Sequence, residues 1–388
     1  MAEVTVVAEL EPWLLRSFKR FPLELSRGQD VYVWDTRGRR YLDMYAGHAV
    51  TSTGHCHPHV VKAIQEQAAK LIFYSNVAGL PLREEAARML VERAPGFSHA
   101  FFANSGAEAN ENALKLARRH TGRHEIVAMQ GGFHGRTAGA VSVTGVEKYR
   151  KQSEPNVPGA IFVPFGDLDA AKRAITTKTA AVILEPIQSM AGIKTAPPAY
   201  HQGLRAACDA AGAVLIYDEV QTGIGRTGTM FFSGRHGVRA DLVTLAKGIA
   251  SGVPLSAVLV SPAMAERVQY GEYGATFGAG PLAMAAMKAT LEVIDRENLL
   301  ENVEVTGAHL AKRMKSLRGV TDVRGVGFLA GVKIEKEAAT VQKALLERGV
   351  VVGTADEPGV LRLLPPLTLQ AGHVDEFARV LDEVLNGA

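Results

Sequence analysis

Two charged residues, Asp218 and Lys247, each stand at the end of a short apolar run. Asp218 follows residues 213–217, and Lys247 follows residues 242–246. Apolar runs of this length between polar residues are typical of strands that are buried on both faces of a parallel sheet. An acid and a lysine at the ends of two such strands would face the crevice in which open α/β sheets hold their ligands.

A lysine and a carboxylate in one crevice could bind pyridoxal phosphate. The aldehyde of this cofactor condenses with a lysine amine, and its ring nitrogen stays protonated only beside a carboxylate. Surface turns also place charged residues after strands, so Asp218 and Lys247 are a weak signal when taken alone. Further residues are needed to hold the phosphate group and the ring.

A Ser-Gly turn at Ser105 and Gly106 could bind a phosphate group. The turn follows the apolar residues 100–103 and opens a helical pattern that runs to Arg119. Helix N-termini offer free backbone N–H groups and the positive end of the helix dipole to an anion. Ser105 could equally act only as the cap of the helix, and for the turn taken alone this second interpretation is the stronger one.

Three further loops carry side chains that could serve the same site. Phe133, in a glycine-rich loop, could stack on a planar cofactor, and Arg136 could bind a carboxylate with its two-pronged guanidinium. Glu185 follows another apolar run and could either hydrogen-bond neighbouring loop residues or balance an arginine. Thr276 lies in a glycine-containing turn and could donate to a phosphate oxygen. Each of these residues could also belong to an ordinary surface loop.

The composition is that of a globular protein without a nucleic-acid or membrane partner. The 388 residues are 47% hydrophobic and 21% charged, and the net charge is +3 without a basic tract. Two cysteines, Cys56 and Cys208, provide neither a disulfide framework nor zinc-finger spacing. The first residues lack the pattern of a signal peptide, and no uncharged run reaches membrane-spanning length. We therefore expect a cytoplasmic protein.

The pattern along the chain predicts an α/β fold with a mostly parallel central sheet. Between about residues 60 and 280, helical patterns alternate with short apolar runs, which is typical of βα units. From Pro281 onward, helix-like stretches alternate with strands at 323–332 and 360–364, which predicts a smaller α+β domain. We expect an N-terminal segment over 1–55 that packs with the small domain, a large domain over 56–280 and the small domain over 281–388.

Two other motifs point to different chemistry and are weaker. Residues 223–228 match the G-x-G-x-x-G pattern of dinucleotide sites, but they begin beyond the end of a strand and do not run into a helical pattern. His55, His57 and His59 alternate along one loop and give no clear tetrahedral metal geometry. We therefore expect no metal site, and a nicotinamide-dependent oxidoreductase is only a remote alternative.

Taken together, the motifs resemble those of the class III aminotransferases of the ornithine and acetylornithine type, which are fold-type I pyridoxal-phosphate enzymes. The resemblance extends from Val33 to Pro366. Its motifs, in the order and spacing of that family, are Asn-Ser-Gly-Ala-Glu-Ala at 104–109, Phe-His-Gly-Arg at 133–136, Asp-Glu-Val-Gln-Thr-Gly at 218–223, Leu-Ala-Lys-Gly at 245–248 and Thr-Phe-Gly at 276–278. The resemblance implies the cofactor pyridoxal 5'-phosphate and a homodimer whose subunits share their active sites.

The resemblance also implies a role for each residue around the cofactor. Lys247 would hold the cofactor covalently and then carry the proton between substrate and cofactor, and Asp218 would keep the ring nitrogen protonated. Phe133 and Val220 would pack on opposite faces of the ring, and Gln221 would reach its phenolic oxygen. The phosphate group would be bound by Ser105, Gly106 and Ala107, joined by Thr276 of the partner subunit.

For the substrates, the resemblance points to two arginines. Arg136 and Arg362 are similar to the pair that binds the carboxylates of the amino acid and of 2-oxoglutarate in this family. Glu185 and Ala275 would lie in the same substrate-binding region.

Two residues depart from the family's pattern. Related enzymes carry a second glutamate where this chain has Met190, and that glutamate screens the C-terminal arginine while an amine donor is bound. Met190 cannot pair with a guanidinium and adds apolar surface to the donor pocket. Phe18 stands where ornithine aminotransferases use a tyrosine hydroxyl on the carboxylate of the donor.

We therefore predict a pyridoxal-phosphate-dependent aminotransferase with a ping-pong mechanism. It would move a terminal amino group from an acetylornithine-like diamino acid or a simpler ω-amine to an oxo acid, either 2-oxoglutarate or pyruvate. A strict acetylornithine or acetyl-lysine-type aminotransferase is the alternative. An aminomutase or decarboxylase with the same cofactor is more remote.

Overall fold

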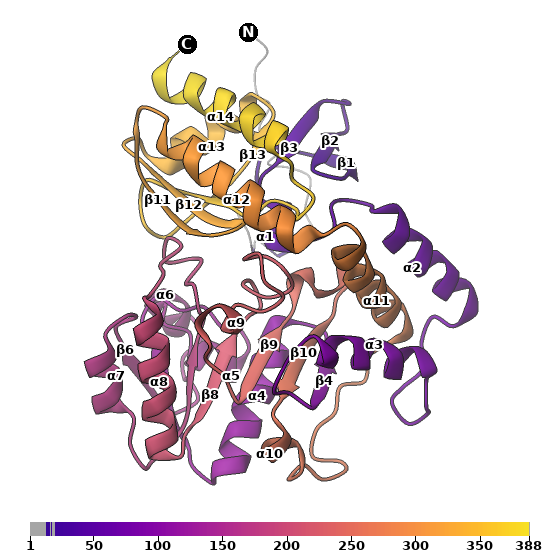
Figure 1. Cartoon of the computed structure of the whole chain (residues 1–388), viewed down its shortest axis with the longest axis vertical. Coiled ribbons are helices and arrows are strands. Elements are labelled where there is room, and N and C mark those ends of the chain that lie inside the picture. The colour runs from indigo at the N-terminus through magenta and orange to yellow at the C-terminus, as the bar shows by residue number, and fades with distance from the viewer. Residues whose placement is uncertain (1–12, 16, 18–19, 388) are drawn as a thin grey trace.

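The computed structural model describes residues 13–15, 17 and 20–387. A seven-stranded sheet in the order β4-β10-β9-β8-β7-β5-β6 lies in the lower part of the molecule in Figure 1. The pairs from β9 to β6 are parallel, whereas β10 runs antiparallel to both of its neighbours, so the expected mostly parallel sheet is confirmed. The strands are β4 (His99–Ala103), β5 (Glu125–Met129), β6 (Ala160–Val163), β7 (Thr179–Leu184), β8 (Val214–Asp218), β9 (Leu242–Leu245) and β10 (Ser256–Val260).

The central strands are apolar because both faces of this sheet are covered. Every residue of β7, β8, β9 and β10 is buried. Leu215 and Tyr217 of β8 pack into one hydrophobic core, whereas Val214 and Ile216 pack into a second one. Side chains of a strand alternate between the two faces of a sheet, so the two cores lie on opposite faces. Burial of each such side chain stabilises the fold by about 1.5–3 kcal/mol.

The helices have ordinary start and stop signals. Several begin with a proline, whose fixed φ suits the first helical position, and α4 ends before Gly122, which has a left-handed φ of 68°. None of the described helices is both long and apolar enough to cross a membrane. The helices are α1 (Ala46–Ala49), α2 (Pro58–Lys70), α3 (Pro81–Glu92), α4 (Gly106–Thr121), α5 (Ala138–Ser142), α6 (Glu147–Lys151), α7 (Leu168–Ala174), α8 (Pro198–Ala211), α9 (Ser233–His236), α10 (Pro262–Ala265), α11 (Pro281–Arg296), α12 (Leu299–Lys315), α13 (Ala338–Glu347), α14 (Ala371–Asn386) and the 3-10 helix η1 (Lys247–Ala250).

Two smaller sheets bring the N-terminal and C-terminal parts of the chain together in the upper part of Figure 1, beside α12, α13 and α14. The first has the order β1-β2-β3-β13, and β13 pairs parallel with β3. The second has the order β11-β12-β15-β14. The N-terminal segment thus packs with C-terminal elements, while the expected domain boundaries at 55/56 and 280/281 stay a prediction. The strands are β1 (Leu25–Gln29), β2 (Tyr32–Asp35), β3 (Arg40–Asp43), β11 (Val320–Val326), β12 (Leu329–Ile334), β13 (Val350–Val351), β14 (Gly353–Thr354) and β15 (Val360–Leu363).

The single strand expected over 323–332 is wrong, because this segment is a hairpin. Strands β11 and β12 pair antiparallel and are joined at Gly327, which has a φ of 58°. The reversal depends on a left-handed backbone conformation at Gly327, which glycine adopts readily.

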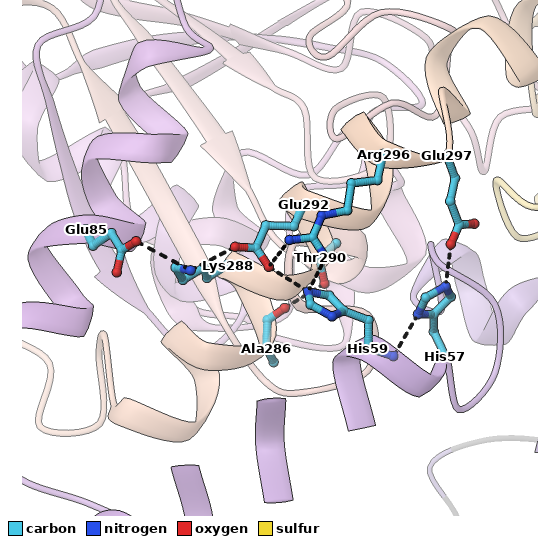
Figure 2. A network of polar contacts seen from close by, with 9 residues as sticks. All are labelled: His57, His59, Glu85, Ala286, Lys288, Thr290, Glu292, Arg296 and Glu297. Atoms are coloured by element: carbon cyan, nitrogen blue, oxygen red, sulfur yellow. Dashed lines mark hydrogen bonds and ion pairs between the residues drawn. The ribbon is translucent and has the colours of Figure 1, made fainter. Parts of the chain in front are cut away.

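The histidines at the start of α2 pair with carboxylates instead of clustering. His57 Nε2 lies 2.8 Å from Glu297 Oε1, and His59 Nε2 lies 2.6 Å from Glu292 Oε2, so both join α2 to the end of α11 (Figure 2). His55 Nε2 lies 2.8 Å from a carboxylate oxygen of Asp43. Within the described part of the chain, no group of three or more histidine, cysteine or acidic residues could hold a metal ion.

Candidate active site

A pocket of about 670 Å³ lies where β7, β8 and β9 end. This is the edge of an open parallel sheet at which ligands bind. Twelve of the predicted residues line the pocket: Ser105, Gly106, Ala107, Phe133, Arg136, Glu185, Met190, Asp218, Val220, Gln221, Lys247 and Arg362.

Three predicted site residues lie away from this pocket or outside the described residues. Ala275 and Thr276 precede α11 and do not line the pocket of their own subunit, and Thr276 is exposed. The prediction for Thr276 concerned the site of a partner subunit, so this position is consistent with it. Phe18 lies outside the described residues.

Asp218 and Lys247 enter the pocket from the ends of neighbouring strands. In the pairing of β8 with β9, Asp218 stands opposite Thr244, three residues before Lys247. Lys247 has a φ of 46°, a left-handed conformation that few residues other than glycine adopt and that is often found at functional sites. Burial lowers the pKa of the Lys247 amine, and the charges of Asp218 and Glu185 oppose this effect. A lowered pKa leaves more of the amine in its neutral, nucleophilic form.

The carboxylate of Asp218 is held by a buried hydrogen-bond network. Asn110 Nδ2 donates to Asp218 Oδ2 at 2.8 Å, and His134 Nδ1 lies 2.8 Å from the same oxygen. Asn110 in turn accepts a hydrogen bond from Thr244 Oγ1 at 2.7 Å. The backbone N–H of Val220 donates to Asp218 Oδ1 at 3.1 Å. These contacts fix the orientation of the carboxylate, and Asn110 and Thr244 are not among the predicted site residues.

The start of α4 lies at the pocket, where the sequence predicts an anion site. Ser105 is the N-cap of this helix, and its hydroxyl accepts a hydrogen bond from the backbone N–H of Glu108 at 3.2 Å. The simpler interpretation of Ser105 as a helix cap is therefore confirmed. The first residues of α4, Gly106 and Ala107, line the pocket, where their N–H groups have no partner within the helix. A Cβ atom on Gly106 would lie 3.0 Å from Val220 Cγ1, so glycine allows this close approach.

Glu185 connects the loops that follow β5 and β7. Its Oε1 accepts a hydrogen bond from Phe133 N at 2.8 Å, and its Oε2 accepts one from Ser189 N at 3.4 Å. Of the two roles left open by the sequence, Glu185 has the first, because its hydrogen bonds go to loop residues. Burial, followed by the nearby charge of Asp218, raises the pKa of Glu185 to about 7.

Arg136 stacks on an aromatic residue that the sequence does not reveal. The guanidinium carbon of Arg136 lies 4.4 Å from the ring centroid of Tyr149, which belongs to α6. The ring of Phe133 meets Tyr149 edge-on, with centroids 5.7 Å apart. Both aromatic rings line the pocket. The contact with Tyr149 therefore places the cationic side chain of Arg136 at the pocket wall.

Arg362 is buried, and its three hydrogen bonds go to uncharged groups. Its Nε donates to Thr354 O at 2.6 Å, its Nη1 to Ser189 Oγ at 3.1 Å and its Nη2 to the hydroxyl of Tyr45 at 2.8 Å. Met190, which follows Ser189, lines the same pocket. Arg362 itself lines the pocket, and its role as the second carboxylate clamp stays a prediction.

The pocket suits pyridoxal phosphate. A lysine amine with a lowered pKa, a carboxylate of fixed orientation and the N-terminus of a long helix line the same cavity. Gln221 also lines it, and its buried Oε1 has no hydrogen-bond partner in the described part of the chain. These groups match the aldehyde, ring nitrogen, phosphate and phenolic oxygen of that cofactor.

Residues 223–228 do not form a dinucleotide site. They lie in turns after β8, where Gly225 and Gly228 have φ values of 85° and 84°, and no helix begins there. A dinucleotide fingerprint requires a helix N-terminus for the pyrophosphate.

Comparisons with known proteins find aminotransferases along nearly the whole chain. The family described as aminotransferase class-III matches residues 16–385. The chain is 41% identical to the acetylornithine aminotransferases of Methanocaldococcus jannaschii, over 95% of both chains, and of Methanosarcina mazei, over 98% of this chain and 96% of the other. Among solved structures, the ornithine aminotransferase of Toxoplasma gondii has a TM-score of 0.91 at 28% identity and covers 97% of this chain and 93% of its own. The acetylornithine aminotransferase of Elizabethkingia anophelis has a TM-score of 0.84 at 28% identity and covers 96% of each chain.

Proposed function

Because this chain belongs to the class III aminotransferases, we propose that it moves the terminal amino group of an acylated diamino acid of the acetylornithine type to a 2-oxo acid. The chain is a transaminase of fold-type I, and its cofactor is pyridoxal 5'-phosphate. The choice of donor is supported by relatives that are named acetylornithine aminotransferases and are 41% identical over 95–98% of this chain.

The observation that carries the proposal is the placing of Lys247 and Asp218 at neighbouring strand ends in one pocket. When bound, pyridoxal phosphate supplies an aldehyde that can take up an amino group and a ring that can accept electrons. Lys247 would attack with its neutral amine and afterwards move a proton at the substrate carbon, as its lowered pKa allows. Asp218 would face the ring nitrogen as a carboxylate held by Asn110 and His134.

We assign the substrate carboxylates to Arg136 and Arg362. Both guanidinium groups line the pocket, and both can bind a carboxylate with two parallel hydrogen bonds. Two such clamps suit a reaction in which a donor amino acid and an oxo acid use the same pocket in turn, which is a ping-pong mechanism. Tyr149 would keep Arg136 in place by stacking.

Met190 supports a second candidate, in which simple ω-amines are the donors. Met190 lines the pocket and directly follows Ser189, which contacts Arg362. It presents apolar surface there in place of a carboxylate. An apolar wall favours donors that lack a carboxylate of their own.

A donor and acceptor panel tests the two candidates. We expect kcat/KM for N-acetylornithine to exceed that for 1-aminobutane at least tenfold, with either 2-oxoglutarate or pyruvate as acceptor. The substitution Met190→Glu should raise KM for the oxo acid, because the new carboxylate competes for Arg362, and Met190→Gln is the uncharged control. A larger kcat/KM for 1-aminobutane would favour the second candidate, and no turnover with any donor would contradict both.

We also propose a homodimer whose subunits complete each other's active sites. Apolar side chains are exposed in two segments that lie against each other, at Ile72, Phe73 and Val77 and at Tyr270 and Phe277. The rings of Phe73 and Phe277 have centroids 5.1 Å apart. An exposed apolar surface of this kind is typical of a protein–protein interface. Its position beside Thr276 supports the assignment of this threonine to the phosphate site of the other subunit.

A further inference from the structure

The segment that leads from β3 into the pocket is a left-handed turn. The residues of α1 have positive φ values of 49° at Ala46, 57° at Gly47, 69° at His48 and 67° at Ala49. Left-handed backbone costs free energy at each residue other than glycine, so such a turn persists only where its surroundings hold it. Asp43 Oδ1 holds its start, because it accepts hydrogen bonds from Tyr45 N at 2.9 Å and from Ala46 N at 2.8 Å.

This turn places Tyr45 and His48 beside Arg362. The Nη2 of Arg362 donates to the hydroxyl oxygen of Tyr45 at 2.8 Å, and that oxygen lies 2.8 Å from His48 Nδ1. A guanidinium can only donate, so the hydroxyl hydrogen of Tyr45 is free to go to His48 Nδ1. His48 is then neutral, with its proton on Nε2. Burial and the charges of Arg362 and Lys247 lower the pKa of His48, which agrees with this tautomer.

A glycine makes room for the ring of Tyr45. Gly353 of β14 stands opposite Arg362 of β15 in the sheet. A Cβ atom on Gly353 would lie only 2.1 Å from Cε2 of Tyr45. The tyrosine therefore fits against Arg362 only because the residue beside it in the sheet has no side chain. Tyr45 is itself 7% exposed, so its hydroxyl has a fixed place.

We propose that Tyr45 and His48 form an uncharged relay that holds Arg362 for a carboxylate of a 2-oxo acid. The relay takes the place of a carboxylate partner, since Thr354 O, Ser189 Oγ and the hydroxyl of Tyr45 are all neutral. The guanidinium consequently keeps its full charge for the substrate carboxylate. Tyr45 and His48 are positioning residues that set specificity for 2-oxo acids. This inference rests on the proposed aminotransferase function.

Binding of 2-oxoglutarate to the cofactor-loaded protein, without an amino donor, tests the relay. In Tyr45→Phe the guanidinium loses one hydrogen bond and its fixed position, and we expect the Kd from isothermal titration calorimetry to rise about tenfold, which corresponds to about 1.4 kcal/mol. In His48→Leu the hydroxyl of Tyr45 loses its acceptor, and we expect a rise of about threefold. His48→Gln keeps an acceptor and should restore the Kd to within twofold of the wild type. Tyr41→Phe is the matched control, because its hydroxyl bonds Asp35 instead.

Steady-state kinetics give a second readout. We expect Tyr45→Phe to change KM for the oxo acid more than kcat, because the relay acts on binding. The relay is wrong if Tyr45→Phe and His48→Leu bind 2-oxoglutarate as tightly as the Tyr41→Phe control. If Tyr45→Phe does not fold, the comparison of His48→Leu with His48→Gln decides, and equal Kd values would overturn the relay. Failure of the proposed function has a different signature, since the wild type would then bind 2-oxoglutarate without turning over any donor.

Discussion

Asn110 links the carboxylate of Asp218 to Thr244 on the neighbouring strand, and its replacement by alanine tests whether this link stabilises the fold and the cofactor site. The side chain of Asn110 is 1% exposed. Its Nδ2 donates to Asp218 Oδ2 at 2.8 Å and to His134 O at 2.7 Å, and its Oδ1 accepts from Thr244 Oγ1 at 2.7 Å. The substitution Asn110→Ala removes all three bonds and leaves three buried polar groups with one partner fewer.

The size of the expected losses in stability and cofactor affinity follows from these three hydrogen bonds. A buried polar group left without its partner costs about 1–3 kcal/mol. Asp218 keeps the contacts of its carboxylate with His134 and Val220, so the loss falls mainly on Thr244 and on the orientation of Asp218. We expect the free energy of unfolding of the cofactor-free protein to fall by about 2–4 kcal/mol. We also expect the Kd of pyridoxal phosphate to rise at least about tenfold, which is 1.4 kcal/mol, because the carboxylate is no longer held toward the ring nitrogen.

Urea unfolding of the cofactor-free protein and equilibrium dialysis against pyridoxal phosphate measure the two effects. Asn112→Ala is the matched control, because Asn112 lies on the same helix and its Nδ2 donates to the nearby Glu108 O at 2.8 Å. We expect this control to cost less than about 1 kcal/mol and to leave the Kd unchanged. The reasoning is refuted if Asn110→Ala loses no more stability than Asn112→Ala and binds the cofactor equally well.

Three further predictions concern other parts of the site. Lys247→Ala should abolish transamination and the visible absorption of covalently held cofactor, and an active variant would rule out Lys247 as the attachment point. Glu185→Gln should flatten the pH dependence of stability, since burial raises the pKa of Glu185 from 4.5 to about 7. Because the pKa is raised in the folded state, the contribution of Glu185 to stability is fully present below pH 4.5 and is lost as the pH rises through about 7. The free energy of unfolding should fall by about 3 kcal/mol over this range. An equal change in the free energy of unfolding of wild type and Glu185→Gln between pH 4.5 and 7, measured with urea, would contradict this prediction. Phe277→Glu should yield monomers by light scattering with weaker cofactor binding, whereas a stable dimer would exclude this surface as the interface.

The strand that ends at Asp218 and the strand that precedes Lys247 could be predicted because burial on both faces makes them mostly apolar. Each run is buried along its whole length, and the two residues follow where the runs end. The sheet edge then brings them together by topology alone. A Ser-Gly turn followed by a helical pattern likewise located Ser105 and Gly106, since a helix N-terminus has a recognisable sequence.

The residues that support the site carried weaker signals. Asn110 lies on the buried side of α4 with Ala109 and Ala113, and a polar residue within that apolar stripe was the only sign of its role. No sequence signal marks Tyr45 and His48, because residues 45–49 have no glycine pattern that indicates a left-handed turn over four residues. The contact of Tyr45 with Arg362 joins the turn after β3 to strand β15 near the other end of the chain, which no local pattern can reveal.

The central claim is that one pocket, lined by Lys247 and Asp218, exchanges an amino group between a donor and an oxo acid. The most direct measurement follows the visible absorption of the cofactor-loaded protein through both half-reactions. We predict that N-acetylornithine alone bleaches the band of the aldehyde form and that 2-oxoglutarate or pyruvate then restores it, with one equivalent of amino acid formed per subunit. A band that persists with N-acetylornithine and with every other ω-amino donor would contradict the account.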